Sequence, residues 1–242
     1  MALDKPLDRY FLDTTAYIEG NKKLRNPQIL AYSAIKQDFD NNPQGEALVV
    51  LPTGTGKSGL ISIAPFCVSK GRVLIISPGR VTNESIKKAQ DPLYDNFCLE
   101  YDVIFDPNNM PVSSEFTTDI SDEHLYSSNI VYSNIHKLTG NWNTRLLKRV
   151  PSDFFDLIII DEAHHAPADT WQEVLSYFSE AKKLHVTGTP FRGDGKKVPG
   201  ELIHETTLSE VMRDRYVKWL RKKTVNAERI EFILSENGEE RC

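Results

Sequence analysis

The stretch Ala47-Leu-Val-Val-Leu-Pro-Thr-Gly-Thr-Gly-Lys-Ser58 runs from a short apolar segment into a glycine-rich turn. Its first five residues are apolar in succession rather than alternately, which is typical of a strand covered on both faces of its sheet. The residues that follow, 57–70, have a helix-like pattern. A buried strand, a glycine-rich turn and a helix in this order predict an α/β fold whose turn can hold phosphate.

The same alternation of strand and helix continues along the chain. Further strand-like apolar runs occupy residues 72–76, 101–105, 129–132, 156–160 and 184–187. Helix-like segments lie before and between these runs, at residues 27–40, 82–90, 135–149 and 168–182. Buried strands that alternate with helices predict a mostly parallel sheet with helices on both faces.

Two regions depart from this alternation. Residues 106–128 are polar and lack a clear period, so we expect a long surface loop with one short helix there. After Pro190, residues 193–200 predict a flexible loop, residues 208–222 a helix and residues 229–234 a strand.

Composition narrows the class of protein. The 242 residues are 40% apolar and 26% charged, as in an ordinary folded domain, and the net charge of -5 means that any polyanion must be bound by a local patch. The three cysteines, Cys67, Cys98 and Cys242, form no CxxC pair, which argues against a disulfide framework and fits a reducing cytoplasm. The longest apolar runs are too short to cross a bilayer, so we expect a cytoplasmic protein without a membrane partner.

The glycine-rich turn has the chemistry of a triphosphate site. Glycine lets the backbone approach phosphate oxygens closely. Lys57 would bring a positive charge to the β- and γ-phosphates, and the Ser58 hydroxyl would ligate Mg²⁺. Leu51 stands where the eight-residue Walker pattern has glycine. The alternative is therefore a strand-to-helix turn that carries Lys-Ser by chance.

A second polar sequence follows another apolar run, in Leu157-Ile-Ile-Ile-Asp-Glu-Ala-His164. The run would deliver two adjacent carboxylates to the carboxyl end of a strand, where open α/β sheets bind their ligands. Asp161 would hold Mg²⁺, and Glu162 would orient and deprotonate an attacking water. Taken alone, the two acids could also form a solvated turn.

Together these sequences resemble a known family. The segments 52–58 and 161–164 are similar to motifs I and II of superfamily 2 helicases and translocases, in which the residue at position 51 need not be glycine. Thr187-Gly-Thr-Pro190 resembles motif III, and its continuation through Phe191 and Arg192 resembles type III restriction-enzyme motor subunits. Leu24-Arg-Asn-Pro-Gln28 resembles the LRxxQ element of the family.

The resemblance implies a RecA-like P-loop NTPase domain that uses ATP and Mg²⁺. The residues that it assigns to the nucleotide are Arg25, Gln28, Pro52, Thr53, Gly54, Thr55, Gly56, Lys57 and Ser58. In the family the glutamine contacts adenine and the arginine packs near the base. Lys57, Asp161 and Glu162 would be catalytic, with Ser58 and Asp161 on the metal, and His164, Thr187 and Thr189 would couple the nucleotide site to movement.

The resemblance also implies contacts to nucleic acid. Ser77 and Arg80 follow the second apolar run, where motif Ia lies, and Ser133 takes the place of motif Ib or Ic. Such residues would contact phosphates without recognising sequence. The alternative for each is an ordinary strand-to-helix turn with a serine at the helix N-cap.

For the domains we expect an N-terminal extension at 1–23, an ATP-binding lobe at 24–206, and a C-terminal helix and linker at 207–242. In related motors this last region leads to a second RecA-like lobe, which supplies the arginine of motif VI. We find no such motif after Arg192, so we expect the second lobe in cis or in trans and weak activity, or none, from the isolated chain.

The implied function is that of a lobe of an ATP-dependent helicase or translocase, with DNA favoured over RNA as its partner. Two alternatives stay open. One is a P-loop switch or kinase that does not involve nucleic acid. The other is a nucleotide-binding scaffold that recruits partners without motor activity.

Overall fold

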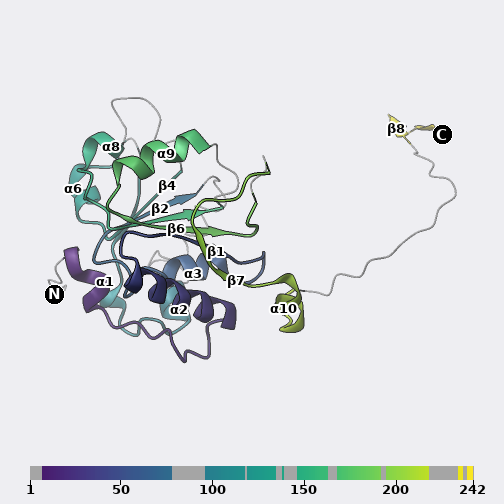
Figure 1. Ribbon diagram of the computed structural model, residues 1–242, viewed down its shortest axis with the longest axis horizontal. Coiled ribbons are helices and arrows are strands. Elements are labelled where there is room, and N and C mark those ends of the chain that lie inside the picture. The colour runs from purple at the N-terminus through teal and green to yellow at the C-terminus, as the bar shows by residue number, and fades with distance from the viewer. Residues whose placement is uncertain are drawn as a thin grey trace.

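A computed structural model describes residues 7–77, 96–117, 119–134, 138, 146–162, 168–191, 195–217, 234–236 and 239–241. Its centre is a seven-stranded sheet with the order β3-β4-β2-β5-β6-β1-β7, and all neighbouring strands are parallel (Figure 1). The strands are β1 (Glu46–Val50), β2 (Val73–Ser77), β3 (Ser113–Glu115), β4 (Ile130–Asn134), β5 (Leu157–Asp161), β6 (Lys182–Thr187) and β7 (Glu201–Glu205). The predicted parallel α/β sheet is confirmed.

Helices cover both faces of the sheet. The helices are η1 (Leu7–Arg9), α1 (Tyr10–Asp13), α2 (Asn26–Asn41), α3 (Lys57–Ile63), α5 (Phe97–Glu100), η2 (Pro107–Asn109), α6 (Asp122–Tyr126), α8 (Leu146–Arg149), α9 (Ala168–Tyr177) and α10 (Leu208–Arg213). In Figure 1, α1, α2 and α3 lie on one side of the sheet, and α6, α8 and α9 lie on the other. A separate antiparallel pair is formed by β8 (Leu234–Glu236) and β9 (Glu239–Arg241).

The two-sided burial explains the unbroken apolar runs. Along β5, Leu157 and Ile159 belong to the core under α2 and α3, whereas Ile158 and Ile160 belong to the core under α8 and α9. Successive side chains of a strand point to opposite faces, so both faces must be apolar when both are covered. None of these four side chains has exposed surface.

Residues 101–105 are not a strand, so that prediction is wrong. Val103 and Ile104 are buried, but their backbone N–H groups donate to the carbonyl of Cys98 at 2.8 and 3.0 Å and close the turn after α5. An apolar segment can thus enter a core without joining a sheet. The outer strands β3 and β7 were missed: β3 lies within the predicted loop 106–128, and β7 is partly exposed.

The helix predictions hold best where the ends carry local signals. The helix predicted at 27–40 is α2, while α3, α9 and α10 are shorter than predicted, since α10 ends at Arg213 and residues 214–217 are not helical. Helix α3 ends at Ile63, just before Pro65, which has no N–H to continue the helical hydrogen bonds. Residues 82–90, most of 135–149, 193–194, 218–222 and 229–233 lie outside the described part of the chain.

The segment 7–23, predicted to be an extension, packs on the lobe. Phe11 and Ile18 are buried in the core that contains α2 and α3. The backbone N–H of Phe11 donates to Lys70 at 2.9 Å, and that of Tyr17 donates to Val103 at 2.8 Å. The domain boundaries themselves stay predictions.

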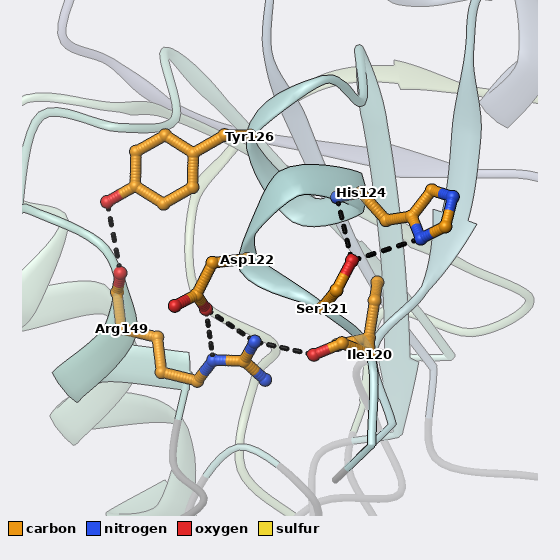
Figure 2. A network of polar contacts seen from close by, with 6 residues as sticks. All are labelled: Ile120, Ser121, Asp122, His124, Tyr126 and Arg149. Atoms are coloured by element: carbon orange, nitrogen blue, oxygen red, sulfur yellow. Dashed lines mark hydrogen bonds and ion pairs between the residues drawn. The ribbon is translucent and has the colours of Figure 1, made fainter.

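Polar contacts join α6 to α8 on the side of the sheet opposite α2 and α3 (Figure 2). The Arg149 guanidinium donates to the Asp122 carboxylate at 2.5 and 2.9 Å and to the carbonyl of Ile120 at 2.6 Å. The Tyr126 hydroxyl donates to the carbonyl of Arg149 at 3.1 Å. These contacts hold two short helices together and have a structural role.

Among the described residues, no helix has the length and apolar character to span a membrane.

Candidate nucleotide-binding site

The carboxyl ends of three adjacent strands bring the predicted motifs together. The glycine-rich turn follows β1, the acid pair ends β5, and residues 187–189 end β6, which lies between β1 and β5. Carboxyl ends of parallel strands meet at one edge of a sheet, which is where such folds bind ligands. Sequences more than 100 residues apart therefore share one edge.

The turn after β1 is shaped by two left-handed glycines. Gly54 and Gly56 have φ values of 91° and 94°, which favour glycine strongly over any other residue. Inside the turn, the Thr55 hydroxyl donates to the carbonyl of Pro52 at 2.7 Å, and Thr55 is buried. Thr53 and Gly54 stay exposed at the tip of the turn, where a ligand can reach the backbone.

Lys57 and Glu162 are in direct contact. The Lys57 Nζ lies 3.2 Å from the Glu162 Oε1, with 14% and 22% of the two side chains exposed. Glu162 also has a left-handed φ of 49°, a strained conformation for a residue with a side chain. A strained conformation persists only where the surrounding structure fixes the backbone. At Glu162 the backbone N–H donates to the carbonyl of Val186 at 2.9 Å, which fixes it to β6.

Asp161 is a buried acid with an unsatisfied oxygen. It is 2% exposed, and its Oδ1 has no hydrogen-bond partner among the described residues. Burial, with the negative charge of Glu162 as the second cause, raises the pKa of Asp161 to about 7. A buried carboxylate oxygen without a partner is costly unless a cation or proton pairs with it.

The start of α2 is bound to the glycine-rich turn. The Gln28 Nε2 donates to the carbonyl of Gly56 at 2.8 Å, and the Gln28 Oε1 accepts from the backbone N–H of Arg25 at 2.9 Å. The Arg25 guanidinium donates to the carbonyl of Gly54. Both predicted base-side residues thus contact the turn, and their predicted contacts to adenine stay predictions.

Residues 187–189 connect β6 to the same turn. The carbonyl of Thr187 accepts from the backbone N–H of Leu51 at 2.8 Å, and the Thr187 hydroxyl donates to the carbonyl of Thr189 at 3.0 Å. A Cβ atom added at Gly188 would lie 3.5 Å from the Lys57 Nζ. The predicted coupling residues that the structure describes therefore lie beside the predicted phosphate lysine.

The predicted nucleic-acid contacts receive less support. Ser77 ends β2 and Ser133 lies near the end of β4, and neither residue has exposed surface. The predicted contacts of Ser77 and Ser133 to nucleic acid stay predictions. Arg80 and His164 lie outside the described residues.

One part of the site had no sequence signal. The Tyr216 hydroxyl accepts from the backbone N–H of Asn26 at 3.3 Å, and the Arg25 Cζ lies 5.5 Å from the centroid of the Tyr216 ring. Val217 packs beside Gly54. Nothing in the sequence of residues 208–217 indicates that this segment returns to the glycine-rich turn.

One family model and several curated proteins match this chain. The family model described as "Type III restriction enzyme, res subunit" matches residues 21–192. The helicase/translocase subunit XPB of general transcription and DNA repair factor IIH from Danio rerio is 27% identical over 193 residues, which cover 76% of this chain and 23% of that protein. The Type I restriction enzyme EcoAI endonuclease subunit from Escherichia coli is 26% identical over 185 residues, which cover 72% and 20%.

Solved structures agree on the fold. The crystal structure of the UvsW helicase from bacteriophage T4 has a TM-score of 0.52 to this chain at 18% identity, with 82% of this chain and 66% of that chain covered. The chain spans between 18% and 46% of the length of seven curated relatives that it matches.

Proposed function

The chain belongs to the type III restriction enzyme res subunit family, and on that basis we propose that it is the ATP-binding lobe of an ATP-dependent DNA helicase or translocase. Family membership confirms the resemblance to superfamily 2 helicases, and the sheet is the RecA-like α/β sheet of such lobes. ATP use follows from the family. The observation that carries the proposal is the 3.2 Å contact between Lys57 and Glu162, which joins the glycine-rich turn to the acid pair.

The residues at this edge fit a triphosphate with a divalent cation. The turn offers exposed backbone at its tip, and Lys57 offers a positive charge beside it. Asp161 has a buried oxygen without a partner among the described residues, and it is the residue that we assign to Mg²⁺, together with the Ser58 hydroxyl. A bound Mg²⁺ would neutralise charge on the phosphates, and its own charge would favour the ionised form of Asp161.

The same geometry suggests how the side chains act. Lys57 is paired with Glu162 here, and phosphate oxygens would compete for its ammonium group. Once Lys57 pairs with phosphate, the Glu162 carboxylate is available to orient a water and to accept its proton. Thr187 and Thr189 lie near Lys57 and would transmit its change of partner, from Glu162 to phosphate, along β6.

We assign two partners to the lobe. One is DNA, because the similar proteins include a helicase/translocase subunit of a DNA repair factor and a DNA 3'-5' translocase. The other is a second RecA-like lobe, in cis or in trans, that supplies an arginine to the γ-phosphate. Such arginines contribute about 10³- to 10⁵-fold to the rate of phosphoryl transfer. The isolated chain should therefore bind ATP but hydrolyse it slowly.

Nucleotide binding is the first test. The purified chain is titrated with a fluorescent ATP analogue and Mg²⁺, alongside the Lys57→Met and Lys36→Met variants. Lys57→Met should bind about 10- to 100-fold more weakly, because a charge-assisted contact is lost. Lys36→Met is the matched control, since Lys36 lies on α2 and pairs with Glu19 at 4.0 Å. Equal affinity for all three proteins would contradict the proposed site.

A second test separates a motor from the two alternatives. In the lobe completed by a second RecA-like lobe, in cis or in trans, double-stranded or single-stranded DNA should stimulate ATP hydrolysis. Glu162→Gln should abolish hydrolysis and movement while ATP still binds. Hydrolysis that DNA leaves unchanged would favour a P-loop switch. Full biological activity of Glu162→Gln would favour a scaffold.

A further inference from the structure

Tyr216 lies at the nucleotide site although 190 residues separate it from Asn26, whose backbone N–H donates to its hydroxyl at 3.3 Å. The Arg25 guanidinium lies over the Tyr216 ring, 5.5 Å from the centroid. A guanidinium within about 6 Å of a ring centroid is attracted by the electron-rich face of the ring. The ring and the start of α2 are therefore joined by two contacts of different kinds.

The contact continues onto the phosphate-binding turn. The Arg25 guanidinium donates to the carbonyl of Gly54. A Cβ atom at Gly54 would lie 2.7 Å from the Val217 Cγ1 and 3.7 Å from the Tyr216 carbonyl oxygen, so residues 216–217 pack on the backbone of Gly54. Arg25 thus bridges two groups, the turn that faces the ligand and the ring of Tyr216.

Helix α10 places Tyr216 there, and its beginning is well anchored. The Thr207 hydroxyl accepts from the backbone N–H of Glu210 at 3.3 Å, while the Glu210 carboxylate accepts from the backbone N–H of Thr207 at 2.7 Å. This reciprocal capping satisfies helix N–H groups that would otherwise lack partners. Val211, in the same helix, has no exposed surface.

The end of α10 turns the chain back onto the site. The Tyr216 N–H donates to the carbonyl of Val211 at 3.0 Å, and the Arg215 N–H donates to the carbonyl of Met212 at 3.1 Å. This pair of bonds is the Schellman motif, which requires a left-handed residue and usually has glycine there. Arg215 takes that conformation with a φ of 62°, at a cost of about 1–2 kcal/mol. The backbone conformation at the end of α10 therefore orients the Tyr216 side chain.

We propose that Tyr216 is a positioning residue of the nucleotide site, whose ring holds the Arg25 guanidinium against the phosphate-binding turn. The inference rests on the proposed nucleotide function and adds the segment 214–217 to that site. It has two consequences. Nucleotide affinity depends on an aromatic ring at position 216. By linkage, bound nucleotide in turn stabilises the segment through which the chain leaves α10.

A double-mutant cycle tests the positioning role. Affinity for a fluorescent ATP analogue with Mg²⁺ is measured for the full chain and for Tyr216→Phe, Tyr216→Leu, Arg25→Met and the Tyr216→Leu/Arg25→Met double variant. Tyr216→Phe keeps the ring and should bind within about twofold of the parent, whereas Tyr216→Leu should bind about 3- to 30-fold more weakly. The double variant should bind no more weakly than Arg25→Met, because the ring acts through Arg25.

Tyr17→Leu is the matched control, because Tyr17 is a partly exposed tyrosine stacked on Phe105, and it should leave affinity unchanged. Parent-like affinity of Tyr216→Leu, equal loss in Tyr216→Phe, or additive losses in the double variant would overturn the inference while leaving the proposed function intact. Failure of the parent chain to bind ATP would instead refute the proposed function, and this inference with it.

A second test uses the unsubstituted chain, so its result does not depend on whether a variant folds. Hydrogen–deuterium exchange of the amides in residues 208–217 should slow when ATP and Mg²⁺ are added. Exchange of this segment that ATP leaves unchanged, in a chain that binds ATP, would also overturn the inference.

Discussion

A Gln28→Glu substitution would replace a buried amide by a carboxyl group of nearly the same shape. Gln28 is 2% exposed, and its side chain donates to the carbonyl of Gly56 at 2.8 Å and accepts from the N–H of Arg25 at 2.9 Å. An ionised carboxylate can keep the second bond but loses the first, because it has no proton to donate. A protonated carboxyl group can make both bonds.

The cost should therefore depend on pH. Burial disfavours the ionised form, so the introduced carboxyl has a higher pKa in the folded chain than its value of about 4.3 in the unfolded chain. The folded state then holds a proton that the unfolded state has lost, and the free energy of unfolding falls as pH rises between the two pKa values. A difference of about 1.5 between them corresponds to about 2 kcal/mol.

Urea denaturation followed by circular dichroism measures this difference. At about pH 8 the variant should be about 2 kcal/mol less stable than the parent, and at about pH 5 the deficit should be less than half as large. Gln28→Ala is the control, since it removes both bonds and cannot titrate, so its deficit should be the same at both pH values. A deficit of Gln28→Glu that does not change with pH would refute the assigned donation to Gly56.

Two further predictions concern the turn and the sheet. Gly56→Ala should abolish nucleotide binding and lower the free energy of unfolding by about 1–2 kcal/mol, because φ is 94° and the new methyl group would clash with the Gln28 amide. Gly195→Ala is the control, since φ is 78° there and no described atom lies within 4 Å of the new methyl group. It should leave binding intact in the same titration. The hydrogen bond from His185 at 2.7 Å holds the pKa of Glu46 below its usual value, so the pair contributes stability above about pH 4.3 that is lost as pH falls through the folded pKa. Glu46→Gln should lack that loss in thermal unfolding between about pH 5 and pH 3, and identical acid profiles of variant and parent would disprove this assignment.

The interior strands could be predicted because burial on both faces restricts them to one sequence pattern. A strand covered on both faces must be apolar at every position, as β5 is, and few other segments of five residues have that pattern. The outer strands lack this constraint. Strand β7 is partly exposed, and Val103 and Ile104 show that burial alone does not place a segment in the sheet.

Sequence alone predicted the family, the glycine-rich turn and the acid pair, because each of these is encoded by a few consecutive residues. Tertiary structure alone decided the remaining features: the contact of Gln28 with Gly56, the position of the Tyr216 ring beside Arg25, and the burial of Ser77 in β2. These features join residues that are far apart in the chain. They depend on how α2 and α10 pack around the sheet edge, and packing between distant segments leaves no periodic or local signal in the sequence.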